Sequence, residues 1–124
     1  MLADSPQALH ELFVAHANKG DVERLLGLYE AKASYVAPDG AQLDGAGAIR
    51  DLLEQLLASR PTFSNETNYV IEAANLALMS NTWCAQIIPP EGDAIELTGT
   101  SIEVARRQPD GGWLYVIDAP ASLS

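Results

Sequence analysis

Three titratable side chains lie within otherwise apolar segments, and their residue types can move protons. Glu103 lies between Ile102 and Val104, Asp118 lies near the end of the last apolar segment, and His16 lies on the apolar stripe of the first helix. Apolar surroundings raise the pKa of a carboxyl group, and an imidazole titrates near neutral pH. We therefore consider Glu103, Asp118 and His16 as candidate catalytic residues for acid–base chemistry.

The direction in which the two carboxylates point is left open by the alternation of side chains along a strand. Glu103 alternates with Ile102 and Val104, a pattern that is equally typical of the solvent side of a half-exposed strand. Asp118 alternates with Ile117, so that Asp118 could instead lie at a dimer face or a strand edge. His10 lies off the stripe that carries His16, and we expect it to be exposed.

The sequence disfavours metal, reactive-thiol and phosphate-binding sites. No two histidines, and no Glu and His, share one helix face at ligand spacing, and there is one cysteine, so we expect no metal and no cofactor. Cys84 has no basic neighbour that would stabilise a thiolate, which favours an inert buried thiol. Gly45 and Gly47 precede a helix without a complete phosphate-binding pattern, and we assign them to the helix start.

Charge and length limit the possible partners. The 124 residues carry 17 acidic and 7 basic side chains, a net charge of −10, which argues against binding to nucleic acid or anionic membranes. The length and the apolar fraction of 48% predict a single domain over residues 1–124. No segment approaches the ~20 apolar residues of a membrane span, and the start does not resemble a signal peptide, so we expect a cytoplasmic protein.

The elements that must position these residues follow from periodicity and turn chemistry. Helices are predicted over 6–18, 22–29 and 45–59, with a short strand at 33–37 that ends in the turn Pro38-Asp39-Gly40. Strands are predicted over 62–73, 76–88, 95–107 and 113–119, joined by short turn-prone links.

Helices followed by strands indicate an α+β fold in which three N-terminal helices pack in a strongly curved antiparallel sheet. Such a sheet would enclose a conical hollow that suits a small apolar molecule. Because the strands carry apolar residues on both faces and the helices can cover only one, we also expect a homodimer through the outer face.

The order and spacing of several short motifs resemble the nuclear transport factor 2-like superfamily, which includes ketosteroid isomerases and SnoaL-like polyketide cyclases. The resemblance covers about residues 8–119. Its motifs are Gly20-Asp21, Leu28-Tyr29, the segment 35–40, Asp44-Gly45 before Ala48-Ile49-Arg50, and Asp110-Gly111-Gly112-Trp113. It implies a cystatin-like α+β cone with an internal pocket, and it leaves the activity open because the superfamily hosts several.

The resemblance to ketosteroid isomerases extends to only part of their machinery. Those enzymes use a carboxylate base, a Tyr hydroxyl and a neutral carboxylic acid. The Tyr position aligns with Phe13 and the base position with Ala37, so neither group is present. The acid position aligns with Glu103, and of two supporting tyrosines one is kept as Tyr29 while the other falls on Leu53. Steroid isomerisation is therefore not expected, whereas Asp118 matches a position where SnoaL-like relatives often carry a proton-transfer group.

The expected pocket and three functions follow from this resemblance. The pocket would be lined by Phe13, Tyr29, Tyr35, Leu53, Tyr69, Trp83 and Ile117. The first hypothesis is a domain that binds a small apolar ligand, and the second is an isomerase or lyase that moves a proton on a carbonyl substrate, with Glu103 or Asp118 as acid or base and His16 assisting. The third is an oligomerisation or partner-binding module, which a cone filled with side chains would favour.

Overall fold

The computed structural model describes residues 3–37 and 39–120, so the expected turn residue Pro38 lies outside the described residues. The elements follow in the order α1 (Pro6–Asn18), α2 (Val22–Leu26), β1 (Tyr29–Val36), β2 (Gln42–Asp44), α3 (Ala46–Leu57), β3 (Thr62–Ala73), β4 (Leu76–Ile87), β5 (Ile95–Arg107) and β6 (Trp113–Ala119). The α+β class is confirmed, and so are the long strands and the first and third helices.

The start of the chain forms helices where side chains cap them. The Ser5 hydroxyl accepts from the Ala8 amide at 3.2 Å, and the Asp21 carboxylate accepts from the Arg24 amide at 3.0 Å. The second helix is shorter than expected, because Leu28 and Tyr29 are buried by strand pairing: the Tyr115 amide donates to the Leu28 carbonyl at 2.8 Å. The prediction that the helix reaches residue 29 is therefore wrong.

One mixed sheet contains all six strands in the order β2-β1-β6-β5-β4-β3. β1 pairs with β6 in parallel, and every other neighbouring pair is antiparallel. The expectation of a purely antiparallel sheet is thus corrected. The predicted short strand at 33–37 is present as β1, which begins earlier, at Tyr29, and β2, which was not predicted, follows it before α3. The parallel pair joins the first strand to the last, which no short turn connects.

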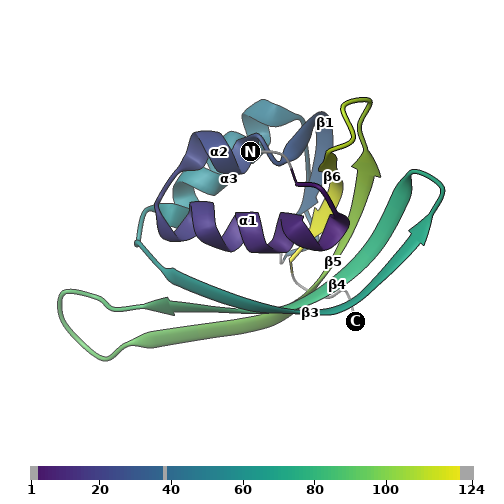
Figure 1. The fold of residues 1–124 in the computed structure, drawn as a ribbon. Coiled ribbons are helices and arrows are strands. Elements are labelled where there is room, and N and C mark those ends of the chain that lie inside the picture. Colours follow the sequence, from purple (N-terminus) through teal and green to yellow (C-terminus); the bar gives the residue numbers. More distant parts are fainter. Residues whose placement is uncertain (1–2, 38, 121–124) are drawn as a thin grey trace.

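The curved sheet holds the helices on its concave side, with α1 crossing over β3, β4 and β5 (Figure 1). The core fills the space between these layers and includes the fully buried side chains of Leu9, Leu25, Ile49, Leu53 and Met79. The hairpin that joins β4 and β5 extends beyond the helices (Figure 1).

Within residues 3–37 and 39–120, no helix has both the length and the apolar composition that crossing a membrane requires.

Two β-bulges change which face the following side chains occupy. In β3 the pairing passes from Thr67 to Tyr69 and leaves Asn68 extra, and in β6 it passes from Tyr115 to Ile117 and leaves Val116 extra. Tyr69 and Ile117 therefore lie on the convex face and are 45% and 41% exposed. Their predicted place in the internal pocket is wrong, because simple alternation ignores the extra residues.

The bulge in β6 also settles the orientation of Asp118. It places Asp118 on the same concave face as Tyr115, where its side chain is buried. The alternative of a dimer face or an exposed strand edge is therefore excluded.

Candidate functional site

Glu103 lies on the concave face of β5 and pairs with a histidine of α1. His10 Nε2 lies 2.7 Å from Glu103 Oε1, and His10 Nδ1 lies 2.8 Å from Thr67 Oγ1. Both members of the pair are almost completely buried, at 2% and 4% exposure. The solvent-facing alternative for Glu103 is therefore wrong.

The expectation that His10 is exposed is also wrong. Along α1, Pro6, His10, Phe13 and Ala17 recur at spacings of three and four residues, and this stripe faces the sheet. The spacing of His10 from Pro6 and Phe13 is the sequence signal that could have identified it. The Asn65 side chain donates to the His10 carbonyl at 3.2 Å and holds this turn of α1 against β3.

The two contacts of His10 specify how its ring is used. A carboxylate accepts only, so Nε2 carries the proton that is donated to Glu103. In the neutral ring Nδ1 is then an acceptor, and the Thr67 hydroxyl donates to it. One oxygen of Glu103 is held in this way, and the other is available for chemistry.

Asp118 is bonded by a different side chain. The Tyr29 hydroxyl of β1 donates to Asp118 Oδ2 at 2.5 Å. Burial, followed by the charge of Glu103, raises the pKa of Asp118 to about 7, although the bond from Tyr29 acts in the opposite direction. Burial also raises the pKa values of Tyr29, Tyr35 and Tyr115, so these phenols stay protonated donors at neutral pH.

The two carboxyl groups belong to one site, because Glu103 and Asp118 are direct Cα partners across β5 and β6. One accepts from an imidazole, and the other changes its protonation state near pH 7. A carboxylate beside a carboxylic acid is the pairing that general base and general acid catalysis needs. Titratable groups buried together in this way mark a candidate functional site.

His16 is not brought to this site. It lies at the end of α1, where its carbonyl accepts from the amides of Lys19 and Asp21 at 3.2 and 3.0 Å. Six residues separate it from His10, about 9 Å along a helix axis. Burial and then the charge of Arg24 lower its pKa. Its predicted assisting role is not supported by this position.

The remaining predicted pocket residues fill the interior. Tyr29, Tyr35 and Leu53 are buried, whereas Phe13 and Trp83 are half-buried. Phe13 packs edge-on against Phe63, with ring centroids 6.2 Å apart. Trp83 covers Gly99 and donates from Nε1 to the Pro120 carbonyl at 2.6 Å. The site residues that sequence reasoning missed are His10, Thr67, Asn81, Ser101 and Tyr115.

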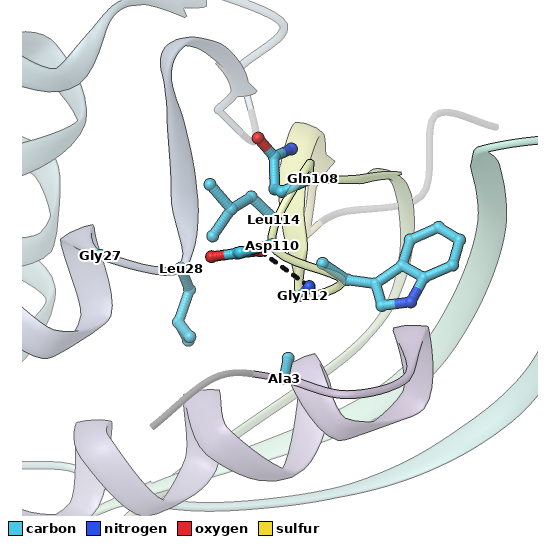
Figure 2. A pocket seen from close by; sticks show the side chains of 8 residues that line it. Ala3, Gly27, Leu28, Gln108, Asp110, Gly112 and Leu114 are labelled. Atoms are coloured by element: carbon cyan, nitrogen blue, oxygen red, sulfur yellow. Dashed lines mark hydrogen bonds between the residues drawn. The ribbon is translucent and has the colours of Figure 1, made fainter.

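Two cavities open elsewhere on the molecule. One of about 260 Å³ is lined by Leu28, Gln108, Asp110 and Trp113, and Figure 2 shows its lining residues with the bond from the Gly112 amide to Asp110. The other, of about 330 Å³, lies beside Arg60 and Ile88. Neither includes the buried carboxylates, so these two cavities do not supply the expected internal pocket. Over the part of the chain that the structure describes, no three His, Cys, Asp or Glu side chains are grouped to hold a metal ion.

Comparison with known proteins identifies the family of the chain. The model of the SnoaL-like domain family matches residues 10–114. The comparison with curated proteins gave no match.

Several solved structures share the fold. A ketosteroid isomerase-like protein from Erwinia carotovora atroseptica has a TM-score of 0.81 at 12% identity, over 95% of this chain and 93% of that one. An NTF2-like protein with a cystatin-like fold from Novosphingobium aromaticivorans has a TM-score of 0.78 at 21% identity, over 94% and 78%. A protein from Thiobacillus denitrificans, named for a calcium/calmodulin-dependent protein kinase type II association domain, has a TM-score of 0.81 at 18% identity, over 100% and 99%.

Proposed function

The chain belongs to the SnoaL-like domain family of the nuclear transport factor 2-like superfamily, and we propose that it binds a small carbonyl compound and moves a proton on it. The observation that carries this proposal is the buried pair of carboxyl groups, Glu103 and Asp118, on directly paired residues with different hydrogen-bond donors. Fold relatives that include a ketosteroid isomerase-like protein support the reaction class only in general terms.

The proposed roles follow from the two environments. Glu103 is the general base: His10 holds one of its oxygens, and the other removes a proton from the carbon next to the carbonyl. Asp118 in its neutral form donates to the carbonyl oxygen, while Tyr29 donates to Oδ2 of Asp118 and holds the carboxyl group in place. The electron pair of the broken C–H bond forms a C=C bond, and the electron pair of the C=O bond takes the proton of Asp118 to give an enol. The enol returns that proton to Asp118, and its carbon takes a proton from Glu103 at the same or a conjugated position, which completes exchange or isomerisation.

Entry to this site requires the cover formed by α1 to shift, because His10, Glu103 and Asp118 are all more than nine-tenths buried. The cover is held at its C-terminal end by Asn18, whose amide group exchanges two hydrogen bonds with the backbone of Phe63 at 3.0 and 2.6 Å. A closed site excludes water from the reacting groups, which strengthens their electrostatic interactions. It also favours a small ligand with an apolar body.

The test is deuterium exchange at the α-carbon of cyclohexanone in D2O, followed by proton NMR. We expect the wild-type protein to accelerate exchange and Glu103→Gln to reduce the protein-dependent rate by about 10²- to 10⁴-fold. Glu66→Gln, which changes an exposed carboxylate of β3, is the matched control and should leave the rate unchanged. Equal rates in wild-type protein and Glu103→Gln would contradict the proposal.

The convex face of the sheet supports a second proposal, that the chain forms a homodimer through it. Ile71, Leu78, Val104 and Ile117 are direct partners across β3, β4, β5 and β6, and we call this set the convex apolar row. Three of the four are 40–57% exposed, and large exposed apolar patches mark interaction sites. A second copy would cover the row with the same apolar surface. We also propose a cytoplasmic location, where Cys84 would stay reduced.

A purely oligomeric role is the alternative function, because side chains fill much of the cone and one fold relative is named for an association domain. Under that alternative the exchange assay gives no protein-dependent rate, while the dimer remains.

A further inference from the structure

Asn81 of β4 carries a buried acceptor without a partner. Its Oδ1 atom makes no hydrogen bond among the described residues, and the residue is 7% exposed. Buried side-chain acceptors are nearly always bonded, because leaving one unpaired costs the desolvation of the group. An unpaired acceptor next to a candidate site therefore points to a donor that arrives with a ligand.

Asn81 lies on the same concave face of the sheet as Glu103, one row of side chains away. Asn81 is the direct partner of Thr67 on one side and of Ser101 on the other, so all three share the concave face. Ser101 is two residues before Glu103 on the same strand face, about 6.5 Å along the strand. The Asn81 side chain is thus one side-chain row away from the proposed general base.

The hydroxyl groups beside Asn81 are already engaged. Ser101 Oγ donates to the backbone carbonyl of Asn81 at 3.2 Å. Thr67 Oγ1 lies 2.8 Å from His10 Nδ1, and it is the donor in that bond when the His10 ring is neutral and donates from Nε2 to Glu103. The fixed neighbours therefore leave Oδ1 of Asn81 free for another donor.

We infer that Asn81 is a specificity-determining residue and that the ligand is a hydroxylated carbonyl compound whose hydroxyl group donates to Asn81 Oδ1. The inference rests on the proposed function for the carbonyl end of the ligand. A ligand of this class satisfies the buried acceptor, whereas its deoxy analogue leaves it unpaired. A buried acceptor left unpaired corresponds to about a 5- to 150-fold loss of affinity.

The test is a pair of binding titrations followed by ¹H–¹⁵N NMR, with 4-hydroxycyclohexanone and cyclohexanone as probes. We expect the wild-type protein to bind the hydroxylated ketone about 5- to 150-fold more tightly, with a shift of the Asn81 side-chain amide resonances only for that ketone. In Asn81→Leu the two affinities should become equal, and Tm should stay the same or rise because the unpaired acceptor is gone. Asn68→Leu, which removes an amide from the opposite face of the sheet, should keep the preference.

The outcomes separate this inference from the proposed function. Equal affinity of the wild-type protein for the two ketones, or binding of neither, overturns the inference, and so does a preference that survives in Asn81→Leu. The wild-type titrations and the Asn81 resonances decide the matter even if Asn81→Leu does not fold. A clear preference without Glu103-dependent exchange overturns only the proposed proton transfer, and Glu103-dependent exchange without a preference overturns only the role of Asn81.

Discussion

Glu103 and Asp118 are direct partners across β5 and β6, yet their carboxyl groups are bonded by side chains from two other elements. His10 of α1 donates to Glu103, and Tyr29 of β1 donates to Asp118. The first helix and the first strand thus supply different hydrogen-bond donors to two acids of the last two strands. Burial and the charge of Glu103 raise the pKa of Asp118, and such a difference between neighbouring carboxyl groups allows one to act as acid and the other as base.

The stability of the protein should depend on pH through Asp118. Its pKa is about 7 in the folded protein and 3.8 in an unperturbed chain, so the folded state retains a proton that the unfolded chain releases. Stability from this group is therefore lost as the pH rises from about 4 to about 7, by about 1.4 kcal/mol per pH unit at most.

Asp118→Asn removes this titration, and its amide oxygen can still accept from Tyr29. Urea unfolding at pH 5 and pH 8 measures the effect. The unfolding free energy of Asp118→Asn minus that of the wild type should be larger at pH 8 than at pH 5. A difference that stays constant over this range would show that Asp118 does not titrate there.

The charge of Glu103 should be detectable at Asp118. This charge helps to raise the pKa of Asp118, although burial is the larger cause. In Glu103→Gln the midpoint of the Asp118 carboxyl ¹³C titration should fall below about 7 and remain above 3.8. Glu66→Gln serves as the control and should leave the midpoint unchanged. An unchanged midpoint in Glu103→Gln would mean that the two carboxyl groups do not interact.

Breaking the His10–Glu103 hydrogen bond should leave a buried carboxylate without compensation. His10→Leu leaves Glu103 buried without its donor, which should lower the free energy of unfolding by about 3–5 kcal/mol at pH 7. The double variant His10→Leu/Glu103→Leu should recover most of that loss, since no uncompensated group remains. Urea unfolding of both single variants and the double variant measures the coupling, and simple additivity would contradict it.

The convex apolar row should hold two copies of the chain together. Leu78 is 40% exposed in the isolated chain, so Leu78→Lys should leave the fold intact and convert a dimer to a monomer. Thr98→Lys, on the same face of β5 and outside the row, should remain dimeric. Sedimentation at micromolar concentration tests this, and a well-folded wild-type monomer would exclude the dimer.

The sequence predicted most of the elements, because their periodicity and breakers are local. The four long strands and the helices α1 and α3 follow from patterns that tertiary packing does not override. The parallel pairing of β1 with β6 was not predicted, because it joins Tyr29 to Tyr115 across most of the chain.

The site was predicted in its two carboxylates and in Tyr29. Alternation misplaced Ile117 and left Asp118 undecided, because the bulge at Val116 has no clear signal in the residues themselves. His10 was missed because it lies off the apolar stripe of the first helix that contains His16. Asn81 was missed because an amide in a strand becomes informative only when its partners are known.

The pH dependence of α-carbon exchange on cyclohexanone tests the central claim most directly. If Asp118 must be protonated to donate to the carbonyl oxygen, the protein-dependent rate should fall as the pH rises through about 7. In Asp118→Asn the amide donates at every pH, so its slower rate should show no such fall. A wild-type rate that rises through pH 7, or a fall that persists in Asp118→Asn, would contradict the assignment of base and acid.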